Sequence, residues 1–244
     1  MIQYVLPPAP VPSVAVHGEA ARFPVRRIFC VGRNYAAHAR EMGKDPDREA
    51  PFFFTKPADA VSDSGGAIPY PPETANLHHE IELVVAIGAE GADVPAAAAL
   101  GLVFGYAVGI DLTRRDLQLA ARDKGRPWDW GKAFDLSAPI APIRRAADVG
   151  HPATGRIWLS VNGAVRQDAD VSELIWPVPD VIAILSRSMT LKPGDLVMTG
   201  TPAGVGAIVP GDAVAGGVEG LGEIAITVAE RAGAPVGAAG RSAA

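Results

Sequence analysis

The chain has 244 residues, of which 48% are hydrophobic and 20% charged, an ordinary composition for a globular protein that is long enough to bury a full core. Its net charge of -5 and the lack of any basic block exclude broad nucleic-acid binding. The single cysteine, Cys30, excludes a disulfide framework within the chain, and its apolar neighbours predict a buried structural thiol in a cytoplasmic protein.

The N-terminal residues 1–27 are rich in proline and irregular, which predicts an arm or a small sheet packed on the main body. The opening MIQYVLPPAP has no cationic stretch, so we do not expect a signal peptide. Residues 28–230 show no repeat and no linker, and we expect one domain there. Within it, Pro95 and several glycines interrupt the apolar stretch 94–110, which predicts a buried segment rather than a membrane span. The Ala/Gly-rich residues 231–244 predict a flexible tail.

Short apolar runs that are rich in β-branched residues predict most of the strands. They lie, in chain order, at 27–32, 52–57, 80–88, 103–112, 194–200, 211–220 and 222–230. Helical spacing predicts helices at 34–43, 94–102, 113–125 and 178–189. Because strands outnumber helices and do not alternate with them, we predict one β-rich α+β domain rather than a doubly wound sheet.

Three local signals add detail to this order. Asn162 and Gly163 stand at the centre of RIWLSVNGAVRQ and predict a tight β-hairpin. Asn34 is the predicted N-cap of the first helix. Thr113 and Asp116 have the spacing of a capping box at the start of the third helix.

Two carboxylates, Glu80 and Glu82, stand at the head of the apolar run LHHEIELVVAIG. Residues i and i+2 of a strand project to the same face, so these side chains lie together, roughly 6.5 to 7 Å apart at the backbone. Two anionic carboxylates that face a core repel each other and lose hydration, which costs several kcal/mol each. A divalent cation removes that cost. The alternative is a strand end where both carboxylates stay solvated or pair with arginines.

Asp111 adds a third carboxylate, at the end of the apolar run VFGYAVGID where a strand meets a helix. Three carboxylates at strand ends make a hard oxygen site of the kind that binds Mg²⁺ or Mn²⁺. His78 would share the face of Glu80 and Glu82 if the strand begins that early, so a His/Glu/Glu site for zinc or iron is the competing hypothesis. His79 points to the opposite face, where we expect a buried structural histidine.

A further pair of polar residues lies in GRNYAAHAREMG. His38 and Glu41 are three residues apart and are therefore neighbours on one face of the predicted helix. A carboxylate beside a histidine raises its basicity and fixes its tautomer, which suits a general base acting on water. A surface pair without a catalytic role fits the same spacing.

Other polar residues suggest a cationic pocket for a small anion. Arg115 and Gln118 share one face of the helix after Asp111, and Lys132 stands between aromatic residues in WDWGKAFD. The glycine-rich TGTPAGVG lacks the lysine of a phosphate loop and the spacing of a dinucleotide fingerprint, so it predicts a tight turn that presents Thr201 to a ligand. The chain has no motif of a nucleophilic serine or cysteine.

Five motifs together resemble the fumarylacetoacetate hydrolase family. They are GRNYAAHAREMG, HHEIELVVAIG, GIDLTRRDLQ, KGRPWDWGKAFD and LVMTGTPAGVG, in the family's order and spacing, and the resemblance covers residues 25–230. Within the family, PFFFTKPADAV and RDKGRPWDWGKAFDLSAPIAPI are most similar to the short bacterial members that hydrolyse fumarylpyruvate, and next to those that hydrolyse acylpyruvates.

The resemblance implies a mixed β-sandwich roll of the family's C-terminal domain type, usually a homodimer, with Mg²⁺ or Mn²⁺ bound. It assigns the metal to Glu80, Glu82 and Asp111. It makes His38 and Glu41 the pair that activates water. No nucleic-acid or membrane partner is implied.

Substrate contacts also follow from the resemblance. Larger family members have a further metal carboxylate upstream of the catalytic histidine, but residues 31–33 of this chain are Val, Gly and Arg, so no fourth carboxylate is assigned. Arg33 is instead a candidate for contact with an anionic substrate. The remaining residues that the family places against substrate are Arg115, Gln118, Lys132 and Thr201.

The implied reaction is hydrolysis of a carbon–carbon bond in a 1,3-diketo acid, with fumarylpyruvate giving fumarate and pyruvate in the degradation of aromatic compounds. The metal and Lys132 would stabilise the charge of the pyruvate enolate. Three alternatives stay open: general hydrolysis of acylpyruvates, decarboxylation of oxaloacetate without an attacking water, and a metal-binding module without catalysis.

Overall fold

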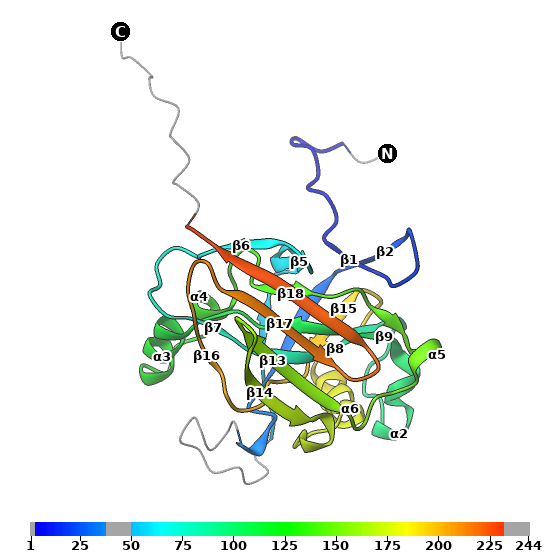
Figure 1. Ribbon diagram of the computed structural model, residues 1–244. Coiled ribbons are helices and arrows are strands. Elements are labelled where there is room, and N and C mark those ends of the chain that lie inside the picture. Colours follow the sequence, from blue (N-terminus) through cyan, green and yellow to red (C-terminus); the bar gives the residue numbers. More distant parts are fainter. Residues whose placement is uncertain (1–2, 38–49, 232–244) are drawn as a thin grey trace.

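The computed structural model describes residues 3–37 and 50–231 (Figure 1). None of the helices in these residues has the length and hydropathy that a membrane span requires. The strands are β1 (Ser13–Ala15), β2 (Arg22–Pro24), β3 (Arg27–Gly32), β4 (Phe52–Lys56), β5 (Val61–Asp63), β6 (Ala67–Pro69), β7 (Leu77–His79), β8 (Ile81–Ile87), β9 (Val103–Ile110), β10 (Thr113–Arg114), β11 (Ala138–Ile140), β12 (Arg144–Arg145), β13 (Arg156–Val161), β14 (Ala164–Asp170), β15 (Asp195–Met198), β16 (Gly206–Ile208), β17 (Ala213–Val218) and β18 (Gly222–Ala229). The α-helices are α2 (Ala96–Ala99), α3 (Arg115–Asp123), α4 (Asp129–Lys132), α5 (Ala146–Val149) and α6 (Val178–Ser188), and the 3-10 turns are η1 (Ala58–Ala60), η2 (Leu100–Leu102) and η3 (Val171–Glu173).

The central layer is an eight-stranded mixed sheet in which β4, β3, β15, β8, β9, β11 and β5 follow one another and β12 pairs with β9. Both faces of β8 are buried. Leu83, Val85 and Ile87 lie in one apolar cluster, and Val84 and Ala86 lie in a second cluster on the opposite face. The continuous apolar run of this strand follows from its position, because a strand covered on both faces has no polar side.

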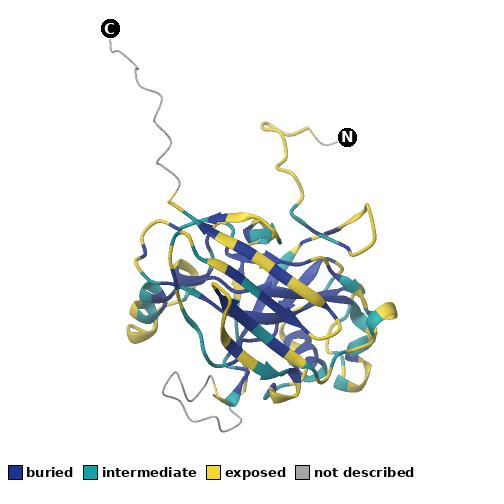
Figure 2. Ribbon diagram, in the orientation of Figure 1, coloured by how far each residue is buried: buried dark blue, intermediate teal, exposed yellow. Residues whose placement is uncertain are grey.

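A second sheet covers one face of the central layer (Figure 1). It has five strands in the order β14-β13-β17-β18-β6. Along β18 buried and exposed residues alternate, as the banding of Figure 2 shows: Ile224, Ile226 and Val228 pack inward, and the residues between them are exposed. The outer face of this sheet therefore meets solvent and its inner face closes the core.

Smaller elements cover the remaining surfaces. A three-stranded sheet of β10, β7 and β16 continues from the start of β8, because only Glu80 separates β7 from β8. Helix α6 packs on α2, and α3 packs on α4. The antiparallel pair β1 and β2 contributes Val14 and Phe23 to the apolar cluster that contains Val84.

The β-rich α+β class is confirmed, and so is the hairpin at Asn162 and Gly163. These two residues join β13 to β14 with φ angles of 52° and 79°. A type I′ turn requires left-handed φ at both central positions, which an Asn-Gly pair adopts at the lowest cost.

The helix predicted at 34–43 lies outside the described residues beyond residue 37, and so does the predicted tail beyond Arg231. The side chain of Asn34 is fully buried. Its amide nitrogen donates to the carbonyls of Trp176 and Thr199 at 2.9 and 2.8 Å. Asn34 therefore joins β3 to the segments before α6 and after β15.

The capping box predicted for Thr113 and Asp116 is wrong. Thr113 lies in β10, and its hydroxyl donates to the carbonyl of Asp111 at 3.1 Å. The carboxylate of Asp116 accepts from the hydroxyl of Thr74 and the N–H of Ala75. Both side chains serve contacts within or between strands and loops, and α3 begins at Arg115 without a side-chain cap.

Candidate active site

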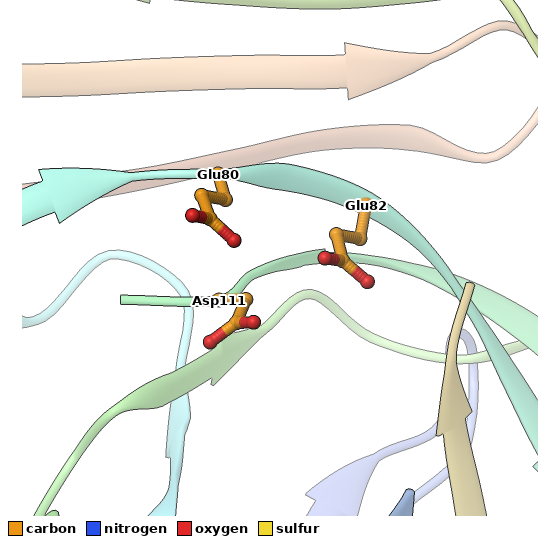
Figure 3. A group of neighbouring side chains, drawn as sticks. All are labelled: Glu80, Glu82 and Asp111. Carbon is orange, nitrogen blue, oxygen red and sulfur yellow. The ribbon is translucent and has the colours of Figure 1, made fainter. Parts of the chain in front are cut away.

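The register of the central sheet brings three carboxylates to one face. Between β8 and β9, Ile81 pairs with Ile110, which places Glu80 opposite Asp111. The backbone N–H of Asp111 donates to the carbonyl of Glu80 at 2.8 Å. Since side chains alternate along a strand, Glu80, Glu82 and Asp111 project to the same side, as Figure 3 shows.

The three carboxylates fit a hard divalent cation. All three residues are buried, and one ligand oxygen from each lies within 4.8 Å of the others. Mg²⁺ holds its ligand oxygens at about 2.0–2.1 Å, so opposite ligands lie about 4.2 Å apart. Three carboxylates are also the donor type that Mg²⁺ and Mn²⁺ prefer.

Two cations contact this acidic cluster. Lys132 Nζ donates to Glu80 Oε2 at 2.7 Å and to Asp111 Oδ2 at 2.6 Å. Arg115 donates to the second oxygen of Glu80 and to the side-chain carbonyl of Gln118. Burial alone would lower the pKa of Lys132, but Asp111 and Glu80 outweigh it and raise that pKa above its usual value. Lys132 is therefore a charged group at neutral pH.

A third cation, Lys56, was not predicted from the sequence. Its side chain has no exposed surface, and Nζ lies 2.8 Å from Asp111 Oδ1. Lys56 also donates to the backbone carbonyls of Leu112 and Lys132. Lys56 therefore pairs with the oxygen of Asp111 that Lys132 does not contact, although this ion pair lacks the geometry of a hydrogen bond. Lys56 thus joins Asp111 to the segment that carries Lys132.

Glu82 has a different environment. Its Oε2 accepts from the backbone N–H of Gly200 at 2.8 Å. Burial raises the pKa of Glu82 well above its usual value, and Asp111 and Glu80 raise it further. Gly200 has φ of 102°, and a Cβ there would lie 2.7 Å from Cβ of Asn34. Glycine is required at this turn by both the backbone angle and the space.

One pocket is lined by eight of the residues that were predicted from the sequence to bind the metal or the substrate. The volume in it that is open to the centres of water-sized molecules is about 30 Å³. The predicted base and its partner, His38 and Glu41, lie outside the described residues. Phe54 and Trp128 also line the pocket and were not predicted. The eight predicted residues are Arg33, Glu80, Glu82, Asp111, Arg115, Gln118, Lys132 and Thr201.

Sequence reasoning also missed the residue that holds Thr201. The hydroxyl of Thr201 accepts from Nε2 of Gln167 at 2.8 Å. Gln167 is fully buried on β14, and its side-chain oxygen accepts from the N–H of Ile81 and contacts Nδ1 of His79. It therefore joins the turn at Thr201 to the strand junction beside Glu80. The prediction of a buried structural His79 is confirmed by the same contact.

The competing site built on His78 is wrong. Nε2 of His78 lies 3.0 Å from the side-chain oxygen of Asn76, and Nδ1 lies 3.4 Å from Nε of Arg115. Burial, aided by Arg115, lowers the pKa of His78 to about 4, so the ring is neutral at pH 7, donates through Nε2 and accepts at Nδ1. Within the described residues, His78 is not part of a metal-ligating group, whereas Glu80 belongs to one.

Replacing Lys56 with methionine is expected to lower the free energy of unfolding by about 3 kcal/mol, the lower end of the range for a broken buried ion pair, because it removes one of the two cations that pair with the buried Asp111. Urea unfolding followed by circular dichroism measures the change. The matched control is Lys192→Met, whose ion pair with Glu90 at 3.4 Å is exposed and should contribute less than about 1 kcal/mol. Equal losses in the two variants would contradict this role of Lys56.

Comparison with known proteins agrees with this geometry. The family model of the fumarylacetoacetate (FAA) hydrolase C-terminal domain matches residues 27–229. The chain belongs to the fumarylacetoacetate hydrolase family. Its two facing sheets are the mixed β-sandwich roll of that family's C-terminal domain, as the five motifs predicted.

Three members of the family show where the chain lies within it. A fumarylpyruvate hydrolase of Ralstonia sp is 48% identical over 192 residues, which covers 77% of this chain and 98% of that protein. The crystal structure of fumarylpyruvate hydrolase from Pseudomonas aeruginosa in complex with Mn²⁺ and pyruvate is 53% identical, with a TM-score of 0.92 over 94% of this chain and 100% of that one. A mitochondrial oxaloacetate tautomerase of Arabidopsis thaliana is 41% identical over 84% of this chain and 92% of that protein.

Proposed function

We propose that this protein is a metal-dependent hydrolase that cleaves fumarylpyruvate to fumarate and pyruvate. The observation that carries the proposal is the buried cluster of Glu80, Glu82 and Asp111, held by Lys132 and Arg115. It occurs in a chain 53% identical to a fumarylpyruvate hydrolase that was crystallised with Mn²⁺ and pyruvate. The two findings support the same chemistry, since the pocket contains ligands for a cation and charges for an anion.

The proposed cofactor is Mg²⁺ or Mn²⁺, and Glu80, Glu82 and Asp111 would hold it. When bound, the ion polarises the 2-oxo acid end of the substrate and carries part of the negative charge that develops there. The three basic side chains that contact the carboxylates already balance their charge, so a divalent ion leaves two positive charges in excess. This balance favours an anionic substrate, and fumarylpyruvate carries two carboxylates.

His38, supported by Glu41, is the proposed general base. It removes a proton from a water molecule whose oxygen forms a bond to the distal acyl carbonyl carbon of the substrate. The bond between this carbon and the neighbouring methylene carbon then breaks, and its electron pair stays with the pyruvate fragment. Protonation of that enolate gives pyruvate, and the acyl fragment leaves as fumarate with the oxygen of the water.

Lys132 is the proposed stabiliser of the enolate. Its ammonium is buried and fixed by Glu80 and Asp111, so it needs no reorganisation when charge develops nearby. The proposed contacts to the 2-oxo acid end come from Arg115, Gln118 and Thr201. Arg115 is itself held by Glu80 and Gln118, which orients its guanidinium toward the pocket.

The test is the conversion of fumarylpyruvate by the purified protein, followed by nuclear magnetic resonance. We expect equal amounts of fumarate and pyruvate in the presence of Mg²⁺. Removing the metal with a chelator should stop the release of both products, and added Mg²⁺ or Mn²⁺ should restore it. Full activity in the chelator would contradict a metal-dependent reaction.

Oxaloacetate is the second candidate substrate, because a relative 41% identical to this chain is an oxaloacetate tautomerase. Its tautomerisation and its decarboxylation both pass through the enol or enolate of a 2-oxo acid and need no attacking water. His38 and Glu41 favour hydrolysis, because hydrolysis needs a base to activate water, but the same base could also move the proton in a tautomerisation. Loss of the oxaloacetate enol absorbance and release of CO₂ would measure the two oxaloacetate reactions separately.

We also propose that the protein is a homodimer that acts in the cytoplasm on products of aromatic degradation. The buried, unpaired thiol of Cys30 is suited to a reducing compartment. Light scattering coupled to size-exclusion chromatography measures the oligomeric state. A monomer at micromolar concentration would contradict the dimer.

A further inference from the structure

Arg33 differs from the other cations of the pocket. Lys132 and Arg115 each bond to carboxylates of the metal cluster. Arg33 lines the same pocket and is half-buried, and its guanidinium makes no hydrogen bond or ion pair with any residue in the part of the chain that the structure describes. Its φ angle of 59° is in the left-handed region, which is strained for an arginine. Strain of this kind is concentrated at functional sites.

An aromatic ring holds Arg33 in place. The guanidinium carbon lies 5.3 Å from the centre of the Phe52 ring, within the range of a cation–π contact. Phe52 can occupy this position because its neighbour on β3 is Gly32. A Cβ on Gly32 would lie only 2.0 Å from Cζ of Phe52. The glycine before Arg33 therefore makes room for the ring on which Arg33 rests.

The same face of β4 leads from Arg33 toward the metal cluster. Phe52, Phe54 and Lys56 alternate along the strand and share one face. Lys56 contacts Asp111, and Nζ of Lys132 lies 5.0 Å from the centre of the Phe54 ring. Along this face of β4, the buried ammonium of Lys56 is followed by the ring of Phe54, which lines the pocket, and then by the ring of Phe52, which contacts the guanidinium of Arg33.

Trp128 completes the aromatic surface. Its ring centre lies 5.1 Å from that of Phe52 at an interplanar angle of 89°, and 5.6 Å from that of Phe54. Trp128 and Phe54 line the pocket together with Arg33. We call these three side chains and Phe52 the distal wall.

We propose that the distal wall selects the acyl group: Phe54 and Trp128 pack against a planar, trans-unsaturated chain, and Arg33 binds the carboxylate at its far end. This inference rests on the proposed function, because it takes the 2-oxo acid end of the substrate to lie at the metal cluster. The preferred substrate class is then a 1,3-diketo acid with a flat acyl chain that ends in a second carboxylate.

The chemistry of each group sets the selectivity. The fork of an arginine pairs with both oxygens of a carboxylate. A conjugated trans chain is flat and already extended, so it packs against aromatic rings without loss of internal rotations. A saturated chain of the same charge must lose those rotations, and a short neutral chain leaves Arg33 without a partner.

The test compares three substrates that differ in one property at a time. Fumarylpyruvate has a flat chain and a distal carboxylate, succinylpyruvate has the carboxylate on a saturated chain, and acetylpyruvate has neither. In Arg33→Gln we expect the ratio of kcat/KM for fumarylpyruvate to that for acetylpyruvate to fall about 10- to 100-fold, the value of a charge-assisted pair. In Trp128→Leu we expect the ratio for fumarylpyruvate to succinylpyruvate to fall about 2- to 10-fold.

Two matched controls isolate the wall from general effects. Trp130 is 79% exposed and stands two residues from Trp128, and Arg187 is exposed on α6. Trp130→Leu and Arg187→Gln should keep both ratios. Gly32→Ala, which displaces Phe52 from beneath Arg33, should lower the fumarylpyruvate to acetylpyruvate ratio and gives a second variant if Arg33→Gln does not fold.

The outcomes separate this inference from the proposed function. Wild-type protein that does not hydrolyse fumarylpyruvate would remove the proposed function, and this inference with it. A second outcome would overturn the role of the distal wall alone. In that case the wild-type protein hydrolyses fumarylpyruvate, and the kcat/KM ratios stay within twofold of the wild type in folded Arg33→Gln, Gly32→Ala and Trp128→Leu. Lowered ratios in these variants but not in the controls would support it.

Discussion

Replacing Glu82 with alanine is expected to lower Mg²⁺ affinity by more than about 100-fold. Changing a residue that only hydrogen-bonds to a metal ligand already lowers metal affinity about 10- to 100-fold, and Glu82 is a proposed ligand itself. Activity should fall with the affinity, because the reaction requires the ion. Glu82 is the best position for this test among the three carboxylates. Its described partner is the N–H of Gly200, whereas Glu80 and Asp111 also hold Lys132.

The fold should survive this change. Removing Glu82 relieves a carboxylate whose pKa is raised by burial and by its acidic neighbours, and the ion pairs of Lys132 remain. Titration calorimetry with Mg²⁺ measures the affinity, and thermal unfolding reports the fold. The control is Glu223→Ala, at an exposed position of β18. Mg²⁺ binding that is equal in Glu82→Ala and the wild type would contradict the assignment of the metal.

Replacing His38 with alanine is expected to reduce turnover by about 10² to 10⁴, the usual contribution of a general base. Mg²⁺ affinity should stay within a few-fold of the wild type, because His38 is not a metal ligand in this proposal. The measurement pairs kcat for fumarylpyruvate with calorimetry of Mg²⁺ binding. Added imidazole should restore part of the activity, since it can supply the missing base from solution.

Two outcomes would argue against this role of His38. Loss of Mg²⁺ binding in His38→Ala would place the histidine among the metal ligands. Turnover equal to that of the wild type would show that another group activates water. The control is His17→Ala, since His17 is exposed beside β1 and is not part of the pocket lining.

The acidic cluster could be predicted from the sequence because its geometry follows from the period of a strand. Glu80 and Glu82 are two residues apart, and an alternating backbone places them on one face. Asp111 was expected nearby because it also ends an apolar run. The register that sets Glu80 opposite Asp111 depends on the pairing of β8 with β9, which local sequence does not specify.

The residues that were missed depend on contacts between distant segments. Gln167 bonds to Thr201 and to His79 beside the strand junction at Glu80. His79 is 88 residues away from Gln167 in the sequence, so no local pattern identifies Gln167 as part of the site. Lys56 left a weaker signal: a lysine two residues after Phe54 in an apolar strand shares a face with it. The prediction of a capping box at Thr113 was wrong for a related reason. The side chain of Thr113 bonds to the carbonyl of Asp111, and that of Asp116 bonds to Thr74, so neither caps the helix.

We propose that this protein hydrolyses fumarylpyruvate in preference to simpler substrates of the same reaction. The most direct test is a side-by-side measurement of kcat/KM for fumarylpyruvate, acetylpyruvate and oxaloacetate at saturating Mg²⁺. We expect the value for fumarylpyruvate to exceed that for acetylpyruvate by about 10- to 100-fold, on the energy scale of one charge-assisted pair. Equal values for the two acylpyruvates, or a higher value for oxaloacetate, would contradict the claim.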